Sequence, residues 1–336
     1  MKSSKQIGVA IIGCGLIGRK RAQALDPARL VVCADTVCER AEALARLNAG
    51  AEATTDWQSA VARKDVKIVI VSTTNDALAP VTIASLQAGK SVLVEKPAAR
   101  TVREIESVIS AAKRAGVLVR VGYNHRYHPA LRQAHAFFED GTLGELMFIR
   151  GRYGHGGRVG YDKEWRANPA LSGGGELIDQ GVHIIDLARW FLGDFDEVTG
   201  FAHTYYWQMP VDDNAFMMLK TPSRQVAFLH VSCTEWKNLF SLEIYGKQAK
   251  LQIEGLGGSY GIERLSYYKM LPQMGPPETT IWEYPAGDNS WQLEFQEFLE
   301  DIRIGRMPSA NLDDAHAALQ IVEQIYRSSE YVVSDK

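Results

Sequence analysis

Residues 7–18 read IGVAIIGCGLIG, and this stretch decides the fold of the first part of the chain. The apolar run from 7 to 12 predicts a buried strand, and the residues after Gly18 predict a helix that follows a tight turn. In this setting the first glycine permits the turn, the second lets a pyrophosphate approach the backbone, and the third lets the helix pack on the strand. The stretch therefore predicts a dinucleotide-binding turn, although the motif alone is a weak signal.

An acidic residue follows the second predicted strand, residues 30–34. It is Asp35, 17 residues past Gly18, where a carboxylate can bind the ribose hydroxyls of the cofactor. A negative charge there repels a 2'-phosphate, which favours NAD(H) over NADP(H). Two alternatives stay open: Asp35 only caps the next helix, or Arg40 nearby weakens the preference and NADP(H) is used.

Strands and helices alternate as far as about residue 122. Further strands are predicted at 66–71, 91–94 and 117–121, and helices at 41–47, 79–88 and 101–115. This alternation predicts an α/β fold, with a doubly wound parallel Rossmann sheet in residues 1–122. Because ligands bind beyond the carboxyl ends of such strands, we expect Asn75, Lys96 and residues 124–126 to line one crevice.

The pattern changes in residues 123–336, where strands follow one another without helices between them. Their predicted ranges are 145–153, 197–207, 214–219, 226–236, 240–245, 249–254 and 263–268. Helices are predicted at 128–139, 174–191, 290–304 and 312–331, with loops at 154–171 and 271–277. This arrangement predicts a second, α+β domain with an antiparallel sheet, while the closing helices can pack back on the first domain.

Residues 173–186 read GGGELIDQGVHIID. Steps of three, four and three residues separate Glu176, Asp179, His183 and Asp186, so a helix would carry them as one polar stripe. Asp179 lies four residues before His183, where its carboxylate can orient the imidazole. Coupled titratable groups behind a glycine-rich turn favour a functional site over a purely structural cluster.

Composition places the chain among ordinary soluble globular proteins. The 336 residues are 46% hydrophobic and 23% charged, with a net charge of −3. There is no basic face for nucleic acid and no segment typical of a signal peptide or a membrane span. The four cysteines, Cys14, Cys33, Cys38 and Cys233, have no metal-binding spacing, which predicts reduced thiols in the cytoplasm and no metal site.

Lys96 follows the strand at 91–94 and precedes a proline. From this place it can reach the crevice of the nicotinamide and hydrogen-bond a substrate oxygen. The alternative is an ordinary surface lysine.

The glycine-rich turn, the sequence EKP at 95–97 and the stretch from Gly173 to Asp186 together resemble the Gfo/Idh/MocA family. The resemblance covers essentially the whole chain and extends to the closing helices around residues 298–306. It implies that Lys96 contacts the substrate hydroxyl and the nicotinamide region, that His183 is the acid/base, and that Asp179 orients the substrate or assists the histidine. It also implies a cis bond before Pro97 and a second domain with a mostly antiparallel open sheet, whose outer face forms a homodimer or homotetramer.

One departure from the family pattern follows the third strand. Residues 74–78 read TNDAL, without the proline and histidine that family members often carry there. Asn75 remains, so only the finer cofactor contacts are in question.

The predicted site residues fall into three groups. Those expected at the cofactor are Gly13, Gly15, Leu16, Ile17, Gly18, Asp35, Thr73, Asn75, Glu95 and Lys96. Those expected at the substrate are Asn124, His125, Arg126, Tyr153, Arg158, Trp165, Arg166 and Trp236, with Arg152, His155 and Tyr161 as further candidates. The catalytic set is Lys96, Asp179 and His183.

These residues predict an NAD(H)-dependent oxidoreductase that transfers hydride between the nicotinamide and a secondary alcohol or ketone of a sugar. Arginines beside aromatic side chains suit a phosphate and a ring, which favours a nucleotide-linked sugar. The alternatives are a free sugar or inositol dehydrogenase, an epimerase that recycles its cofactor, and a non-catalytic NAD(H)-binding sensor.

Overall fold

The structure is a computed structural model, and it describes residues 6–330. The chain divides into two compact units. The first contains the residues up to Tyr123 together with Trp291–His316, and the second contains Asn124–Ser290 together with the residues from Ala317. This division lies one residue after the predicted domain boundary and assigns most of the first closing helix to the first unit.

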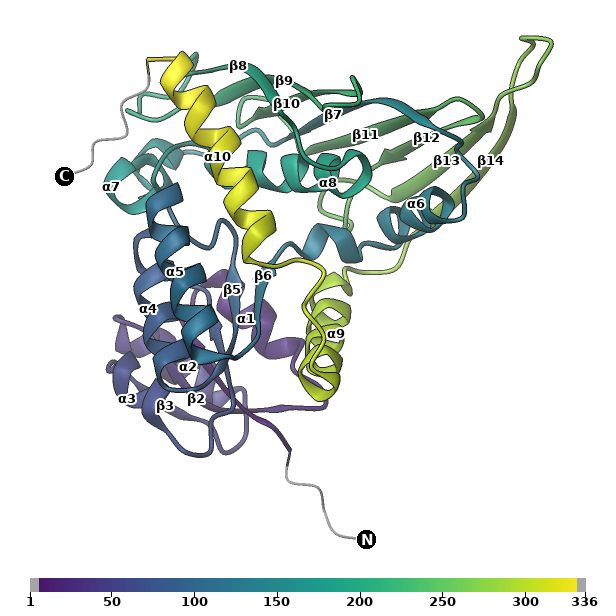
Figure 1. Ribbon diagram of the computed structural model, residues 1–336. Coiled ribbons are helices and arrows are strands. Elements are labelled where there is room, and N and C mark those ends of the chain that lie inside the picture. The colour runs from purple at the N-terminus through teal and green to yellow at the C-terminus, as the bar shows by residue number, and fades with distance from the viewer. Residues whose placement is uncertain (1–5, 331–336) are drawn as a thin grey trace, which may run out of the picture. The chain divides into compact units, whose positions relative to one another are not determined.

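The first unit contains a parallel sheet, of which Figure 1 labels β2, β3, β5 and β6. Its six strands follow the order β3-β2-β1-β4-β5-β6. The strands are β1 (Gly8–Ile12), β2 (Arg29–Ala34), β3 (Glu52–Thr54), β4 (Ile68–Val71), β5 (Ser91–Glu95) and β6 (Val119–Gly122). The helices are α1 (Leu16–Gln23), α2 (Cys38–Arg46), α3 (Trp57–Ala62), α4 (Asn75–Gln87), α5 (Val102–Ala115) and α9 (Ser290–Ile304). The predicted Rossmann fold is confirmed.

Two elements of this unit were not predicted from the sequence. Strand β3 is only three residues long and none of its residues is buried, so it carries no apolar pattern. Helix α3 has six residues and begins at the N-cap Asp56, whose carboxylate accepts two backbone N–H groups. Helix α4 begins at Asn75, four residues before the predicted start, so that Pro80 lies inside the helix.

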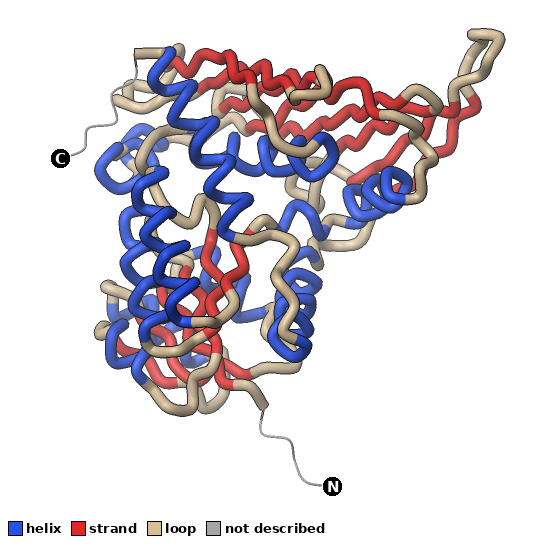
Figure 2. The backbone as a smooth tube through the Cα atoms, in the orientation of Figure 1, coloured by secondary structure: helices blue, strands red, loops and turns tan. Residues whose placement is uncertain are grey.

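The second unit is built on an eight-stranded sheet in the order β14-β13-β12-β11-β7-β10-β9-β8, in which only β7 and β10 pair in parallel. Figure 2 shows these strands as one extended layer. They are β7 (Leu146–Gly154), β8 (Glu197–His203), β9 (Asn214–Lys220), β10 (Val226–Ser232), β11 (Leu239–Gly246), β12 (Ala249–Glu254), β13 (Glu263–Lys269) and β14 (Glu278–Tyr284). Helices α6 (Pro129–Glu139) and α8 (Val182–Leu192) pack on one face of the sheet. The mostly antiparallel sheet was predicted correctly.

Several local predictions in this unit were wrong. Strand β14 was missed because none of its residues is buried. The single helix expected at 174–191 is instead a π-helical turn, Leu177–Gly181, followed by α8. The expected loop at 154–171 contains short helical segments at Tyr161–Lys163, Trp165–Ala167 and Pro169–Ser172 (α7), and Asn124–Tyr127 forms another short 3-10 segment. The last helix, α10, spans Leu312–Ser328, and its expected last residue, Tyr331, lies outside the described residues.

Among residues 6–330, no helix combines the length and the apolar character that a membrane crossing requires.

Candidate active site

The glycine-rich turn of the first unit leaves space only where a cofactor would need it. A Cβ atom at Gly13 would lie 2.4 Å from the backbone oxygen of Ser72, and one at Gly18 would lie 2.0 Å from the backbone oxygen of Gly13. Gly13 also has a φ of +96°, which favours glycine. A Cβ at Gly15 would meet nothing within 4 Å. The turn is therefore closed at its two ends and open at the glycine where a pyrophosphate would approach.

Asp35 lies directly beside this turn. Its Oδ2 accepts the backbone N–H of Cys14 at 2.8 Å, and its Oδ1 accepts the backbone N–H of Val37 at 2.9 Å. Asp35 is half-buried. The two hydrogen bonds hold its carboxylate against the turn, which is the place that the sequence predicts for a ribose contact.

Replacing Asp35 with serine is expected to weaken NADH binding by about 10- to 100-fold, because a hydrogen bond to a charged group contributes about 1.5–3 kcal/mol. The same change removes the repulsion of a 2'-phosphate, so NADPH binding should be weakened less or improved. Fluorescence titration of both nucleotides measures the change. An unaltered NADH:NADPH affinity ratio would leave Asp35 with only its role in the turn.

The remaining cofactor candidates lie at the ends of β1, β4 and β5. Leu16 and Ile17 open helix α1, Thr73 precedes α4, and Asn75 is its buried first residue. Lys96 is half-buried after β5, and the Lys96–Pro97 bond is cis, as the resemblance implied. Glu95 is directed elsewhere, since its carboxylate accepts the Nε–H of Arg21 at 2.6 Å.

In the second unit, Asp212 holds the triple glycine in place. Its carboxylate accepts the backbone N–H groups of Gly175 at 2.9 Å and Leu177 at 2.7 Å, and the hydroxyl of Tyr326 at 2.7 Å. A Cβ at Gly175 would lie 1.9 Å from the backbone oxygen of Asp212, and a Cβ at Gly174 would lie 2.2 Å from the Tyr326 hydroxyl. Only glycine allows this contact, which fixes the start of the π-helical turn.

Burial raises the pKa of Asp212 from 3.8 to about 6, although its three donors oppose the shift. Because the folded-state pKa is higher than the unfolded one, the contribution of this group to stability is complete below pH 4 and is lost as the pH rises through 6. Tyr326→Phe removes one donor to the carboxylate, which raises this pKa further. The variant should lose about 1.5–3 kcal/mol of unfolding free energy at pH 8 and less at pH 5. Urea unfolding at both pH values measures this, with Tyr284→Phe as the control, and an equal loss at both would contradict it.

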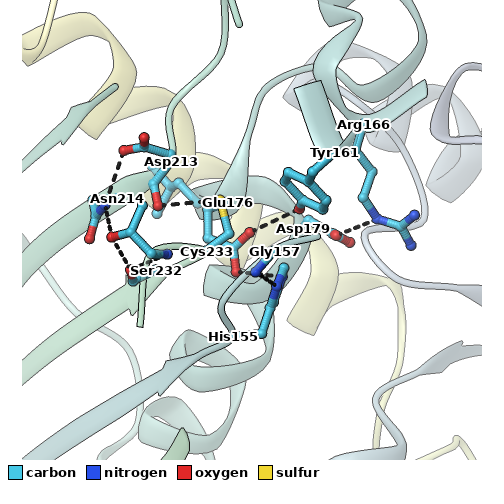
Figure 3. Close-up of polar contacts among 12 residues, drawn as sticks. His155, Gly157, Tyr161, Arg166, Glu176, Asp179, Asp213, Asn214, Ser232 and Cys233 are labelled. Atoms are coloured by element: carbon cyan, nitrogen blue, oxygen red, sulfur yellow. Dashed lines mark hydrogen bonds and ion pairs between the residues drawn. The ribbon is translucent and has the colours of Figure 1, made fainter. Parts of the chain in front are cut away.

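Beyond the glycines, Glu176 and Asp179 form the polar cluster of Figure 3. Asp179 Oδ2 accepts Nε–H of Arg166 at 2.8 Å, and this charge raises the pKa of the Arg166 guanidinium. The Oε2 atom of Glu176 accepts the hydroxyl of Tyr161 at 3.5 Å, and its Oε1 lies 3.6 Å from His155 Nε2. Since His155 Nδ1 accepts the N–H of Gly157 at 3.0 Å, the neutral ring carries its proton on Nε2, facing Glu176.

The phenols around these carboxylates are held in the protonated form. Burial, with the negative charges of Glu176 and Asp179, raises the pKa of Tyr153, Tyr161 and Tyr260. Such phenols remain hydrogen-bond donors at neutral pH. The cluster therefore offers neutral donors beside two buried carboxylates, which suits a ligand rich in hydroxyl groups.

His183 lies in the first turn of α8 and is buried, with 4% of the residue exposed. Its ring stacks on that of His125, with 3.8 Å between the ring centroids. The last member of the predicted stripe, Asp186, accepts Nε–H of Arg126 at 2.8 Å. All four residues of the stripe are buried, and each contacts a different neighbour. Glu176 contacts Tyr161 and His155, and Asp179 pairs with Arg166. His183 stacks on His125, and Asp186 pairs with Arg126.

The other substrate candidates are distributed more widely. Arg158 pairs with Glu164 through two bonds of 2.7 Å, and the ring of Trp165 lies under the guanidinium of Arg166. Trp236 is 69% exposed and meets the edge of Tyr206. Asn124 and Tyr153 are buried around the two histidines. Arg152 is exposed and alternates along β7 with the buried residues that face α8, so it points to the other side of the sheet.

Two family models match the chain. The model of the GFO/IDH/MocA C-terminal domain covers residues 131–252, and that of the oxidoreductase family with an NAD-binding Rossmann fold covers residues 7–123. Inositol 2-dehydrogenase 2 of Saccharopolyspora erythraea is 30% identical over 344 aligned positions, which include 96% of this chain and 93% of that enzyme. The chain belongs to the Gfo/Idh/MocA oxidoreductase family.

Other relatives agree with this assignment. Levoglucosan dehydrogenase of Pseudarthrobacter phenanthrenivorans is 29% identical over 231 residues, and that match spans 65% of this chain but only 59% of the enzyme. A solved structure of levoglucosan dehydrogenase with NADH and levoglucosan has the same fold, with a TM-score of 0.87 at 24% identity and 97% coverage of each chain. The protein is thus an oxidoreductase whose first unit is an NAD-binding Rossmann domain.

Sequence reasoning missed several residues that shape the site of this family member. Asp212 and Tyr326 hold the triple glycine, and Tyr260 lies against Tyr153 with 5.2 Å between ring centroids. Trp207 packs against Tyr161 and donates its indole N–H to the backbone oxygen of Cys233. These residues come from separate strands and loops, and only the pair of aspartates before β9 was a visible signal.

Proposed function

We propose that this protein is an NAD(H)-dependent dehydrogenase that acts on a secondary alcohol of an uncharged sugar or cyclic polyol. The proposal rests on one observation: three arginines of the second unit are paired with carboxylates. Arg126 is held by Asp186, Arg158 by Glu164, and Arg166 by Asp179. An arginine whose guanidinium is already bound to a carboxylate has little charge left to offer a phosphate. The named relatives, inositol 2-dehydrogenase 2 and levoglucosan dehydrogenase, support the same substrate class.

In the proposed reaction His183 accepts the proton of the substrate hydroxyl. Lys96 stabilises the negative charge that develops on that oxygen, and Asp179, with Arg166, orients the substrate. Bound NAD⁺ supplies the hydride acceptor. Ketone reduction uses the same residues in the reverse direction.

A nucleotide-linked sugar is the second candidate. The side chain of Arg158 is 63% exposed although it is paired with Glu164. Such an exposed pair is weak, so a phosphate could replace the carboxylate.

The substrate class is tested by incubating the purified protein with NAD⁺ and separate panels of inositols, free sugars and nucleotide sugars, while nicotinamide absorbance is followed. A signal from the uncharged panels that Lys96→Ala abolishes supports the proposal. A signal from nucleotide sugars alone favours the second candidate. Silence with NAD(H) already bound would indicate the recycling epimerase, and silence without cofactor binding would overturn the proposal.

The proposal includes a homo-oligomer formed through the second sheet. The face that α8 does not cover carries neighbouring apolar side chains: Phe201 (63% exposed), Phe216 (37%), Met218 (53%) and Phe228 (52%). A continuous exposed apolar patch is typical of a protein interface. The four free cysteines agree with a cytoplasmic location, which we also propose.

The double change Phe216→Asp and Phe228→Asp should dissociate this oligomer, because it would bury two unpaired charges in the interface. Size-exclusion chromatography with light scattering measures the mass of the protein in solution. Ile262→Asp, at an exposed residue outside the patch, is the matched control. A wild-type monomer, or a double variant of unchanged mass, would contradict this part of the proposal.

A further inference from the structure

Two imidazole rings lie face to face in the buried part of the second unit. The rings of His125 and His183 are 3.8 Å apart at their centroids and 16° from parallel. Only 6% of His125 and 4% of His183 is exposed. His125 comes from the short segment after β6, and His183 from the first turn of α8. Because one ring covers the face of the other, the plane of His183 is fixed by its neighbour.

A chain of hydrogen bonds sets the protonation of His125. The hydroxyl of Ser290 donates to Asp288 Oδ1 at 2.5 Å, so its oxygen accepts Nδ2–H of Asn124 at 2.9 Å. The side-chain oxygen of Asn124 therefore faces Nδ1 of His125, at 3.2 Å. An amide oxygen only accepts, so Nδ1 of His125 must carry a proton. A neutral His125 is thus the Nδ1–H tautomer.

We propose that His125 is a positioning residue for the catalytic base, not a substrate ligand. Its neutral ring stacks on His183, holds that imidazole in the plane needed for proton transfer, and prevents the pair from holding two protons. Two positive rings 3.8 Å apart would repel each other strongly in a buried site. This inference rests on the proposed role of His183.

The groups around the pair fit this assignment. From the same segment, Arg126 is paired with Asp186 of α8, and His128, the N-cap of α6, is paired with Glu263 of β13. From β7, Tyr153 meets His125 edge-on, with 5.2 Å between ring centroids. On the π-helical turn, Asp179 is paired with Arg166, while Glu176 accepts the hydroxyl of Tyr161. Asp288 is bound by Ser290 and lies 4.0 Å from His128 Nε2. Each of these carboxylates is bound by an arginine, a histidine or a hydroxyl group.

The kinetic test compares two replacements of His125. His125→Ala removes the stack and should lower kcat by roughly 10- to 100-fold, with KM changed less than about 3-fold, because misplacement of a catalytic group acts on turnover. His125→Phe keeps a ring on His183 and should restore kcat to within about 5-fold of wild type. The matched control is His135→Phe, which replaces a histidine of α6 that stacks on Trp190 at 3.7 Å and is not assigned to catalysis. A raised KM with unchanged kcat in His125→Ala would show a substrate ligand and overturn the proposal.

The second test needs no substrate. Nitrogen NMR of histidine-labelled protein follows both rings between pH 8.5 and 5.5, with His125→Phe and His183→Phe used for assignment. We expect the wild-type pair to bind a single proton in this range, whereas two independent histidines would bind two. Uptake of two protons by the pair would overturn the proposal.

The two tests separate this inference from the proposed function. If the protein is inactive on every substrate but its two histidines share one proton, the proposed function is wrong and the pairing of the histidines stands. An active enzyme that needs His183 but tolerates His125→Ala would remove only the positioning role.

Discussion

Replacing His183 with phenylalanine should lower kcat by about 10²–10⁴-fold, the loss expected when a general base is removed. Phenylalanine keeps an aromatic ring stacked on His125, so the buried packing of the site is largely retained. His183→Ala should lose at least as much activity, because it also removes the ring. Steady-state rates with NAD⁺ and the substrate found in the panel measure both losses.

Two further observations make this result specific. His135→Phe should keep near-normal turnover, since His135 lies in α6, stacks on Trp190 and is not among the residues assigned to catalysis. NADH affinity of the His183 variants should match wild type, because the glycine turn and Asp35 belong to the first unit. Near-normal turnover of His183→Phe would refute the assignment of the general base.

Much of the fold could be predicted because its signals are local. A Cβ atom at Gly13 or Gly18 would lie 2.4 or 2.0 Å from a backbone oxygen, and Gly13 directly follows β1 while Gly18 lies in the first turn of α1. Strands β1 and β4 are fully buried and apolar throughout, and β5 has a buried apolar centre at Val92–Val94. Strands β3 and β14 bury no residue, so no hydrophobic period marks them.

The sequence suggested residues for the candidate site but not the contacts that they make. The spacing of Asp179 and His183 made both of them candidates, yet the ion pair to Arg166 and the stack on His125 join segments 13 and 58 residues apart. The same limit explains the arginines. In the sequence, arginines near aromatic residues indicated a phosphate site. The structure shows that these arginines are paired with carboxylates, which the sequence does not reveal.

Replacing Arg21 with methionine should destabilise the first unit by about 3–5 kcal/mol, the usual effect of removing one partner from a buried ion pair. Arg21 bonds Glu95 at 2.6 Å and Glu294 of α9 at 2.5 Å, and the Arg21 and Glu294 side chains are fully buried. Methionine would fill a similar volume but would leave two carboxylates without their cation. The loss should appear in thermal and urea unfolding.

The pH dependence of this loss distinguishes an unpaired charge from poor packing. Burial raises the pKa of Glu294 even with Arg21 present, and removing the arginine raises it further. A carboxyl whose folded-state pKa is raised contributes stability at low pH and loses it as the pH increases, so Arg21→Met should be least stable at pH 8 and should partly recover toward pH 5. Arg303→Met, which breaks an exposed pair with Glu300 on the same helix, should leave the melting temperature nearly unchanged. A deficit in Arg21→Met that does not vary with pH would mean that packing around the guanidinium, rather than its charge, stabilises this part of the first unit.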